Sequence, residues 1–178
     1  RIGEFKIGSK SLITPNIFPV VNPFQNVIPP TELYNDFGAQ ALFTNAYIIY
    51  QNKEKNSHII EKGLHKHLGF PGIIATDSGG FQDYMYGGDL KITPEEIEPF
   101  QEKIGSDCPV ILDIPVQTTD SYEAAKKKID ITLHRAKKNI ERRNRIDTAW
   151  FGPIHGSIYP KLLKYSAQEM SKLEYGIY

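Results

Sequence analysis

The sequence predicts an α/β fold of the (β/α)8 TIM-barrel type, with only about the first five to six βα units present in this chain of 178 residues. Short apolar segments alternate with helical patterns, which is typical of parallel strands joined by crossover helices. Polar residues follow the apolar segments at successive strand ends, where a barrel has its active-site mouth. An open doubly wound sheet is the competing architecture, but no G-x-G-x-x-G string follows the first strand to mark a dinucleotide site.

Five apolar segments are the expected strands, at 17–23, 41–47, 72–78, 109–115 and 149–155, and residues 175–178 begin a sixth. The first three are nearly continuous in apolar residues, as strands covered on both faces are. Six strands cannot close an eight-stranded barrel, so about 70 or more residues of the usual fold are expected outside the chain. We therefore expect residues 1–178 to form a single partial catalytic barrel domain, without the C-terminal barrel strands.

Helices are expected at 31–37, near 52–68, from 93, from 120 and at about 160–174. Thr93 and Glu96 form a T-x-x-E capping box around Pro94, and Gly105 marks the end of that helix. The longest helix is expected to begin at Asp120. Its apolar stripe, at spacings of three and four, is Tyr122, Ala125, Ile129, Leu133, Ala136 and Ile140. The last helix is expected to have an inner face formed by Leu163, Ala167 and Met170.

The composition is that of an ordinary globular domain, with 40% apolar and 24% charged residues. Lys and Arg number 21, as do Asp and Glu, so a broad attraction to nucleic acid is not indicated. The basic run 135–145 is expected to be a solvated helix face, with RNA contact as the alternative. The lone cysteine, Cys108, excludes an internal disulfide and fits a reducing, cytoplasmic location. No apolar run approaches the roughly 20 residues of a membrane span.

Asp77 ends an apolar run and is followed by Ser78, Gly79 and Gly80. A buried carboxylate without partners is costly, and small residues let a ligand approach the backbone. Phe81 then suits a planar ring held beside the acid. The other interpretation is a strand-end Asp that caps a turn, with Phe81 in the core.

Asp113 repeats this arrangement one strand later, and His155 follows the fifth strand. Two carboxylates at neighbouring strand ends can divide acid/base and recognition duties. A carboxylate can also accept two N–H groups from the edge of a guanine-like base. Each residue has a structural interpretation as well, Asp113 as a loop cap and His155 as a structural histidine. Asn22 and Asn45 are weaker candidates, and we expect no metal ligand among the histidines on the helices, His58, His65, His67 and His134.

Four strings of the sequence resemble tRNA-guanine transglycosylases: TDSGGFQ (76–82), ITPEEIEPFQEKIGSD (92–107), LDIP (112–115) and HGSIYPKLLKYSAQEMSKLEYGIY (155–178). VVNPF and TNAYIIY resemble early barrel strands of that family, so the resemblance covers nearly the whole chain. FQDYMYGGDLKIT and LDIP are similar to the archaeal branch. That branch replaces a guanine in the D-loop of tRNA with 7-cyano-7-deazaguanine (preQ0), on the route to archaeosine.

The resemblance implies a TIM barrel that exchanges a base. An aspartate attacks C1′ of the target nucleotide, guanine leaves, and a covalent aspartyl-ribose intermediate passes the ribose to the incoming deazaguanine. The chemistry is similar to retaining glycoside transfer, and the target base must first leave its stack. Zn²⁺ is expected in full-length family members, with ligands outside this chain. The second catalytic aspartate and the RNA-binding domains are also expected outside it.

Site residues follow from the resemblance motif by motif. Asp77 matches the catalytic aspartate of the D-S-G string, which serves as acid/base or, in some assignments, as nucleophile. Ser78 and Phe81 match positions that hold and stack on the base, and Asp113 matches the carboxylate that reads its N–H edge. His155 stands where the family usually has Gln, in V-Q-G-G or V-Q-G-S. Imidazole is shorter and changes its number of donors with protonation, so this departure bears directly on base recognition.

The expected partners are tRNA, a 7-deazaguanine base, and a homodimer mate or second chain that completes the barrel, because the edges of an unclosed barrel favour association. A competing hypothesis is a non-catalytic or differently catalytic relative that binds tRNA or the modified base, such as an archaeosine synthase-like paralogue or an accessory subunit. An unrelated α/β glycosidase is the third class, and it requires the motif matches to be coincidental.

Overall fold

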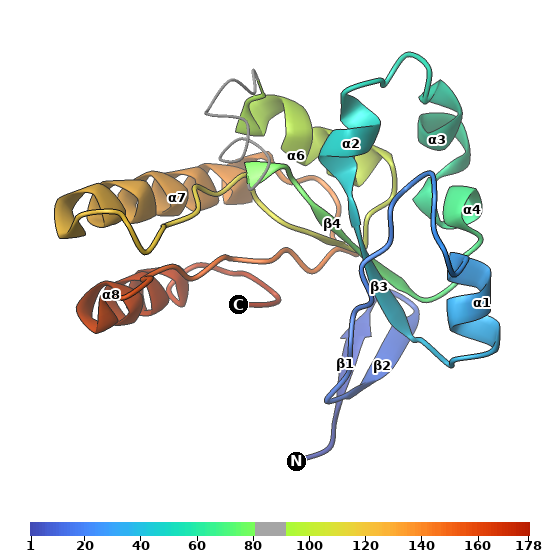
Figure 1. Cartoon of the computed structure of the whole chain (residues 1–178), viewed down its shortest axis with the longest axis horizontal. Helices are drawn as coiled ribbons and strands as arrows, with labels where there is room; N and C mark the ends of the chain where they lie inside the picture. The colour runs from blue at the N-terminus through green and yellow to red at the C-terminus, as the bar shows by residue number, and fades with distance from the viewer. Residues whose placement is uncertain (81–91) are drawn as a thin grey trace.

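The computed structural model describes residues 1–80 and 92–178, and its centre is a parallel sheet. The sheet contains β3 (Ala41–Asn45), β4 (Ile73–Asp77) and β5 (Cys108–Pro109), in this order. β3 and β4 are labelled in Figure 1. β3 and β4 pair so that Asn45 lies opposite Asp77 at their carboxyl ends. Two of the expected strands, 41–47 and 72–78, are therefore confirmed with slightly shorter bounds.

Single parallel bridges continue this sheet on both sides. Val20 pairs with Phe43, Val110 with Phe151, and Phe151 with Ile177. Neighbouring segments therefore follow one another in chain order, as in a barrel, whereas a doubly wound sheet reverses its order. The expected segments 17–23, 149–155 and 175–178 take these places but pair through one residue each. The sheet does not close among the described residues, and the closed barrel stays a prediction.

The expected strand 109–115 is shorter in the structure than in the sequence analysis. Its paired part is β5 with Val110, whose N–H donates to the carbonyl of Thr76 at 3.0 Å. Proline lacks the N–H that a sheet ladder needs, and Pro109 and Pro115 flank the segment. Asp113 therefore lies beyond the paired residues, in an extended segment that leaves the sheet.

An antiparallel hairpin, which the sequence analysis did not predict, precedes the sheet. β1 (Gly3–Ile7) and β2 (Lys10–Thr14) are joined by the two residues Gly8 and Ser9. Ile7 and Leu12 are buried in one cluster with residues of β3, β4 and β5. The signal was present in the sequence, because alternating apolar residues flank a Gly-Ser dipeptide.

The helix expected near 52–68 is wrong as a continuous element. The structure has instead α2 (Ala46–Tyr50), α3 (Ser57–Lys62) and α4 (Leu64–Leu68), after an earlier helix α1 (Pro30–Asn35). α2 follows β3 directly because the Oδ1 of Asn45 accepts the N–H of Ile48 at 3.0 Å and caps the helix. Gly63, at φ 82°, separates α3 from α4.

Three longer helices follow: α6 (Pro94–Lys103), α7 (Tyr122–Arg142) and α8 (Pro160–Met170). The capping box of α6 is confirmed, since Glu96 accepts the N–H of Thr93 at 3.0 Å. The expected start of α7 at Asp120 is wrong by two residues, because the helix begins at Tyr122 and Ser121 is its N-cap. The hydroxyl of Ser121 accepts the N–H of Ala124 and caps the helix, while Asp120 forms an ion pair with Lys128 at 2.7 Å.

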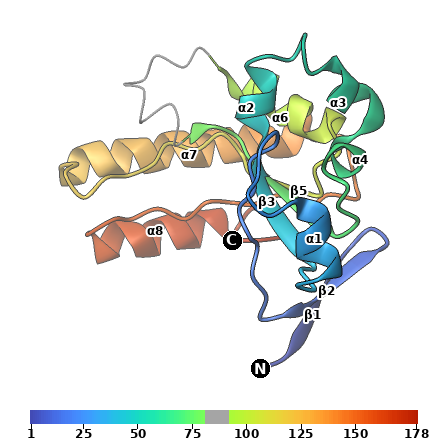
Figure 2. The same ribbon diagram turned by 45° about the vertical axis from the view of Figure 1, so that its right-hand side comes forward.

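α7 and α8 lie side by side in both views, away from α1, α3 and α4 (Figures 1 and 2). Of the stripe expected on α7, Tyr122 is an exception because it is 39% exposed. The inner face expected for α8 is partly wrong. Leu163 is 47% exposed, and the buried positions are Leu162, Ser166 and Met170. Ser166 turns inward because its hydroxyl accepts the N–H of His155 at 3.1 Å.

Candidate active site

Asp77 is the last residue of β4. The four residues before it are buried, and all four are β-branched or apolar types that suit a strand between two covered faces. Among residues 1–80 and 92–178, the hydrogen bonds to the carboxylate of Asp77 are long, from the N–H of Gly79 at 3.4 Å and from the side-chain amide of Asn45 at 3.5 Å. The sheet therefore carries this acid to its carboxyl edge with weak support.

Burial raises the pKa of Asp77 above its ordinary value, because the charged form loses solvation. The N–H of Gly79 acts in the opposite direction and stabilises the carboxylate. The negative charge of Asp113 raises the pKa further. Asp77 is thus an acid that holds its proton more tightly than a solvated aspartate, which suits a group that gives and takes protons.

Asp113 approaches the turn after β4 closely. A Cβ atom placed on Gly80 would lie 2.6 Å from the Oδ1 of Asp113, and one on Gly79 would lie 2.8 Å from the ring of Tyr47. Gly79 also has a φ of 100°, a conformation that other residues rarely adopt. The two glycines are therefore required by the approach of the chain's own residues. They bring Asp113 next to the turn that carries Asp77.

Asp113 also contacts His155 across a separation of 42 residues in sequence. The Nε2 of His155 lies 2.7 Å from the Oδ2 of Asp113, and the two side chains are 21% and 13% exposed. The loop that carries His155 is held by its bond to Ser166 of α8. The segment that carries Asp113 is held by Arg135 of α7, which donates to the carbonyl of Leu112 at 2.9 Å.

Three of the residues predicted from the sequence, Asp77, Asp113 and His155, therefore meet at the same edge of the sheet. Ser78 is fully buried, and its hydroxyl donates to the carbonyl of Ile111 at 2.8 Å. That bond joins β4 to the segment leading to Asp113, so the structure gives the hydroxyl a structural partner, and its contact with a base stays a prediction. Phe81 lies outside the described residues.

The two asparagine candidates have different surroundings. Asn22 accepts the N–H groups of Phe24 and Gln25 through its side chain and closes a local turn. Asn45 caps α2 and reaches Asp77 at 3.5 Å, so it borders the site. Of the two, Asn45 is the one that the fold brings to the carboxylates.

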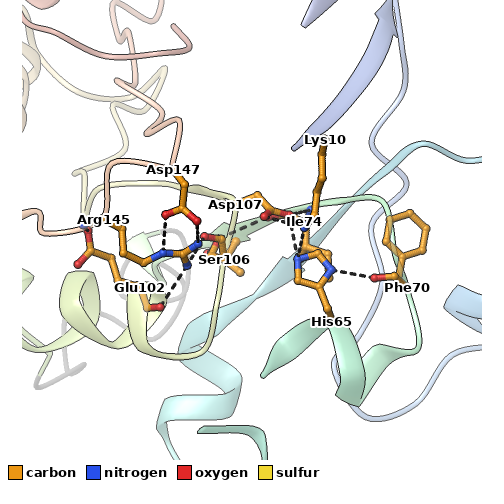
Figure 3. Close-up of polar contacts among 10 residues, drawn as sticks. Lys10, His65, Phe70, Ile74, Glu102, Ser106, Asp107, Arg145 and Asp147 are labelled. Atoms are coloured by element: carbon orange, nitrogen blue, oxygen red, sulfur yellow. Dashed lines mark hydrogen bonds and ion pairs between the residues drawn. The ribbon is translucent and has the colours of Figure 1, made fainter. Parts of the chain in front are cut away.

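A second polar cluster, which the sequence analysis missed, lies at the opposite edge of the sheet (Figure 3). Asp107 lies just before β5. The ammonium group of Lys10 donates to both carboxylate oxygens of Asp107, at 2.7 and 2.8 Å, and the N–H of Ile74 donates to the same carboxylate at 2.9 Å. The Nε2 of His65 is 2.9 Å from Asp107, and its Nδ1 donates to the carbonyl of Phe70. Lys10 is 97 residues away in sequence, and no local pattern points to this contact.

Within residues 1–80 and 92–178, no group of three or more His, Cys, Asp or Glu side chains is arranged to hold a metal ion. Cys108 is buried, and burial raises the pKa of its thiol to about 12, so it is a poor thiolate ligand. The family resemblance implies zinc ligands outside this chain, and no chemical step here is assigned to zinc. In the same part of the chain, no helix has the length and apolar character needed to cross a membrane.

Within the described part of the chain, three of the six basic residues in the run 135–145 form ion pairs. The pairs are Lys138–Glu141, Arg142–Glu95, Arg142–Glu98 and Arg145–Asp147, all between 2.6 and 2.9 Å. Arg142 departs from the expected solvated face, because it is 23% exposed and its partner Glu98 is 2% exposed. Contact of this run with RNA stays a prediction.

Comparison with known proteins gives consistent matches along the whole chain. A family model described as queuine tRNA-ribosyltransferase matches residues 1–178. The chain is 44% identical to the tRNA-guanine(15) transglycosylase of Nanoarchaeum equitans, 43% identical to that of Methanosarcina barkeri and 40% identical to that of Thermococcus kodakarensis. The matches cover 100% of this chain, but they cover 41%, 36% and 30% of those relatives. The chain thus spans less than half the length of the curated relatives it matches.

Proposed function

Because the chain belongs to the queuine tRNA-ribosyltransferase family, we propose that it carries part of the catalytic centre of a tRNA-guanine transglycosylase, a pentosyltransferase. The observation that carries the proposal is the meeting of Asp77 and Asp113 at one edge of the sheet, where the charge of Asp113 raises the pKa of Asp77. The names of the relatives support guanine 15 of tRNA as the target. The proposed incoming base is preQ0, which keeps the hydrogen-bonding edge of guanine.

We assign Asp77 as the acid/base of the exchange. In the first half, the bond from C1′ of the ribose to N9 of guanine breaks while a second carboxylate forms a bond to C1′. Asp77 gives its proton to the leaving base. In the second half, N9 of the incoming base bonds to C1′, the carboxylate leaves, and Asp77 takes up the N9 proton. The raised pKa of Asp77 supports this role, because the group must hold a proton in one half-reaction and accept one in the other.

Asp113 is the proposed reader of the base. A carboxylate with two oxygens can accept two neighbouring N–H groups, and guanine and 7-deazaguanines present such a pair on one edge. The base reaches this site only when it has left the tRNA stack, as for other enzymes that act on a nucleobase. Ser78 and Phe81 are the further positions proposed to hold it, from the family resemblance.

The carboxylate that forms the covalent aspartyl-ribose intermediate is proposed to come from outside these residues, as are the zinc ligands and the RNA-binding domains. An apolar hollow of about 480 Å³ supports the need for additional strands. It is lined by Phe5, Leu12, Phe18, Phe43, Phe151 and Ile177. An apolar surface of this kind is normally covered. Strands that complete the barrel, from the same polypeptide, a homodimer mate or a second chain, are proposed to cover it. A cytoplasmic location follows from tRNA as the substrate.

The test is incorporation of labelled guanine into unmodified tRNA by the intact protein. We expect incorporation by the natural protein and loss of at least about 100-fold in Asp77→Ala, the scale of an acid/base group. Asp147→Ala is the matched control, because this aspartate is exposed and pairs with Arg145 away from the site. If the natural protein binds tRNA but incorporates no guanine, the transglycosylase proposal is wrong and a binding subunit or archaeosine synthase-like paralogue replaces it.

A further inference from the structure

We propose that His155 decides which of the two carboxyl groups carries the proton: by donating to Asp113 it keeps Asp113 ionised and leaves the proton on Asp77. This inference rests on the proposed function, and it adds a positioning residue that acts through Asp113. Two carboxyl groups that share a site rarely ionise together, because like charges repel at short range. Something in the structure must therefore set which one is charged.

The hydrogen bonds of the two acids differ in length. The contact between His155 and Asp113 is short, at 2.7 Å, and it is mostly buried. The contacts of Asp77 with Gly79 and Asn45 are 3.4 and 3.5 Å, the outer limit for a hydrogen bond. A short bond from a nitrogen donor stabilises the charged form of a carboxylate, and this bond reaches only Asp113.

The tautomer of His155 follows from its partner. A carboxylate oxygen only accepts, so the Nε2 of His155 carries the hydrogen that lies between the two groups. The bond persists whether the imidazole is neutral or charged, since protonation takes place at Nδ1. No hydrogen bond to Nδ1 is formed among the described residues. When His155 is charged, its attraction for Asp113 increases.

Groups from each neighbouring element face this pair. β4 contributes the carboxyl group of Asp77, whose pKa the charge of Asp113 raises. α7 contributes Arg135, which donates to the carbonyl of Leu112 next to Asp113. α8 contributes the neutral hydroxyl of Ser166, which binds the backbone N–H of His155. Among these, His155 is the group with a direct hydrogen bond to the Asp113 carboxylate.

The consequence for base exchange is a division of labour. Asp113 must be a carboxylate to accept the N–H groups of the incoming base, and Asp77 must hold a proton to release guanine. Without the donor at residue 155, the proton would be shared between the two acids. A protonated Asp113 would direct its O–H group at the N–H groups of the base. Two donors would then face each other, and base binding would weaken.

The experiment measures KM for guanine and kcat for incorporation into tRNA between pH 5 and 8, using the intact protein. We expect His155→Leu to raise KM for guanine about tenfold or more near neutral pH, the scale of one charged hydrogen bond, with a smaller change in kcat. The acid-side rise of KM should also move to higher pH. His155→Gln, which keeps a neutral N–H donor on a longer side chain, should restore KM. His134→Leu, an exposed histidine on α7, is the matched control.

A second measurement needs no activity. The side-chain carboxyl carbons of ¹³C-labelled aspartates in the natural protein are followed by NMR as the pH is lowered. We expect Asp113 to take up its proton at lower pH than Asp77, and the order to reverse or the gap to narrow in His155→Leu. The proposal is overturned if Asp113 protonates first in the natural protein, or if His155→Leu lowers kcat and leaves KM unchanged at every pH. A natural protein that incorporates no guanine contradicts the proposed function, and the NMR titration still decides the role of His155.

Discussion

Two aspartate–histidine pairs lie at opposite edges of the same sheet, and their surroundings differ. Asp107 with His65 is at the edge where β4 and β5 begin, and Asp113 with His155 is at the edge where they end. Asp107 also receives Lys10 and the N–H of Ile74, so a cation and a backbone donor support one carboxylate (Figure 3). At the other edge, within the described part of the chain, the imidazole of His155 contacts Asp113, and the hydrogen bonds to Asp77 beside it are long.

The pKa shifts of the two regions run in opposite directions. Burial disfavours ionisation of Asp107, but hydrogen bonds from His65, Lys10 and Ile74 outweigh it and lower the pKa. For Asp77, burial is the largest influence, and with the charge of Asp113 it raises the pKa. A satisfied carboxylate stabilises the fold, whereas an unsatisfied one retains reactivity. The comparison shows that burial alone does not distinguish a structural acid from a functional one. The number of close hydrogen-bond donors to the carboxylate does distinguish them.

The largest effect on the free energy of unfolding is expected for Asp107→Asn. The change removes the charge that Lys10 pairs with and leaves that ammonium partly buried, at 27% exposure, without its counter-ion. We expect a loss of about 3 kcal/mol in the free energy of unfolding, the scale for breaking a buried ion pair. Urea unfolding followed by circular dichroism measures it. Asp147→Asn, which removes an exposed ion pair, should change the same quantity by less than about 1 kcal/mol. Equal losses in the two variants would contradict the structural role of Asp107.

A smaller effect of opposite sign is expected for Asp77→Asn. The substitution keeps the shape of the side chain and removes a charge that burial disfavours, so the fold should gain up to about 1 kcal/mol, a common gain when a functional group is removed. The same variant should lose base exchange. Thermal unfolding of the natural protein and the variant at pH 7 tests this. A clear drop in Tm would show that the carboxylate of Asp77 supports the fold, and the contrast between the two edges would not hold.

The smallest expected effect is the change of these two stability differences with pH. It separates the lowered pKa of Asp107 from the raised pKa of Asp77 as causes. The folded-state pKa of Asp107 is lowered, so its stabilisation is present above its ordinary value of 3.8 and is lost only as pH falls through the lower folded value. The folded-state pKa of Asp77 is raised, so the penalty for its ionisation begins above 3.8 and is complete only above the folded value. From pH 4 upward, the loss in Asp107→Asn should stay nearly constant while the gain in Asp77→Asn grows. Urea unfolding at several pH values measures both, and a gain that is constant with pH would contradict the raised pKa.

Local sequence patterns predicted the elements that depend on near neighbours. The apolar runs gave β3 and β4 almost to the residue, and the T-x-x-E string gave the start of α6. Patterns failed where a distant contact overrides the local signal. Ser166 lies on the inner face of α8 because it binds the loop at His155, so the apolar residue Leu163 is left exposed. The break at Gly63 likewise replaced a long helix by two short ones.

The sequence by itself determined that Asp77 and Asp113 end neighbouring segments, because an apolar run fixes where a strand lies and parallel strands end at the same edge. Only the tertiary structure decided which acids have partners. His155 reaches Asp113 across 42 residues and Lys10 reaches Asp107 across 97, and no periodicity of the chain encodes such distances. Those contacts depend on how the helices and the hairpin pack against the sheet. This packing gives Asp107 a cation and a backbone donor at one edge, whereas at the other edge the hydrogen bonds to Asp77 from the described residues are long.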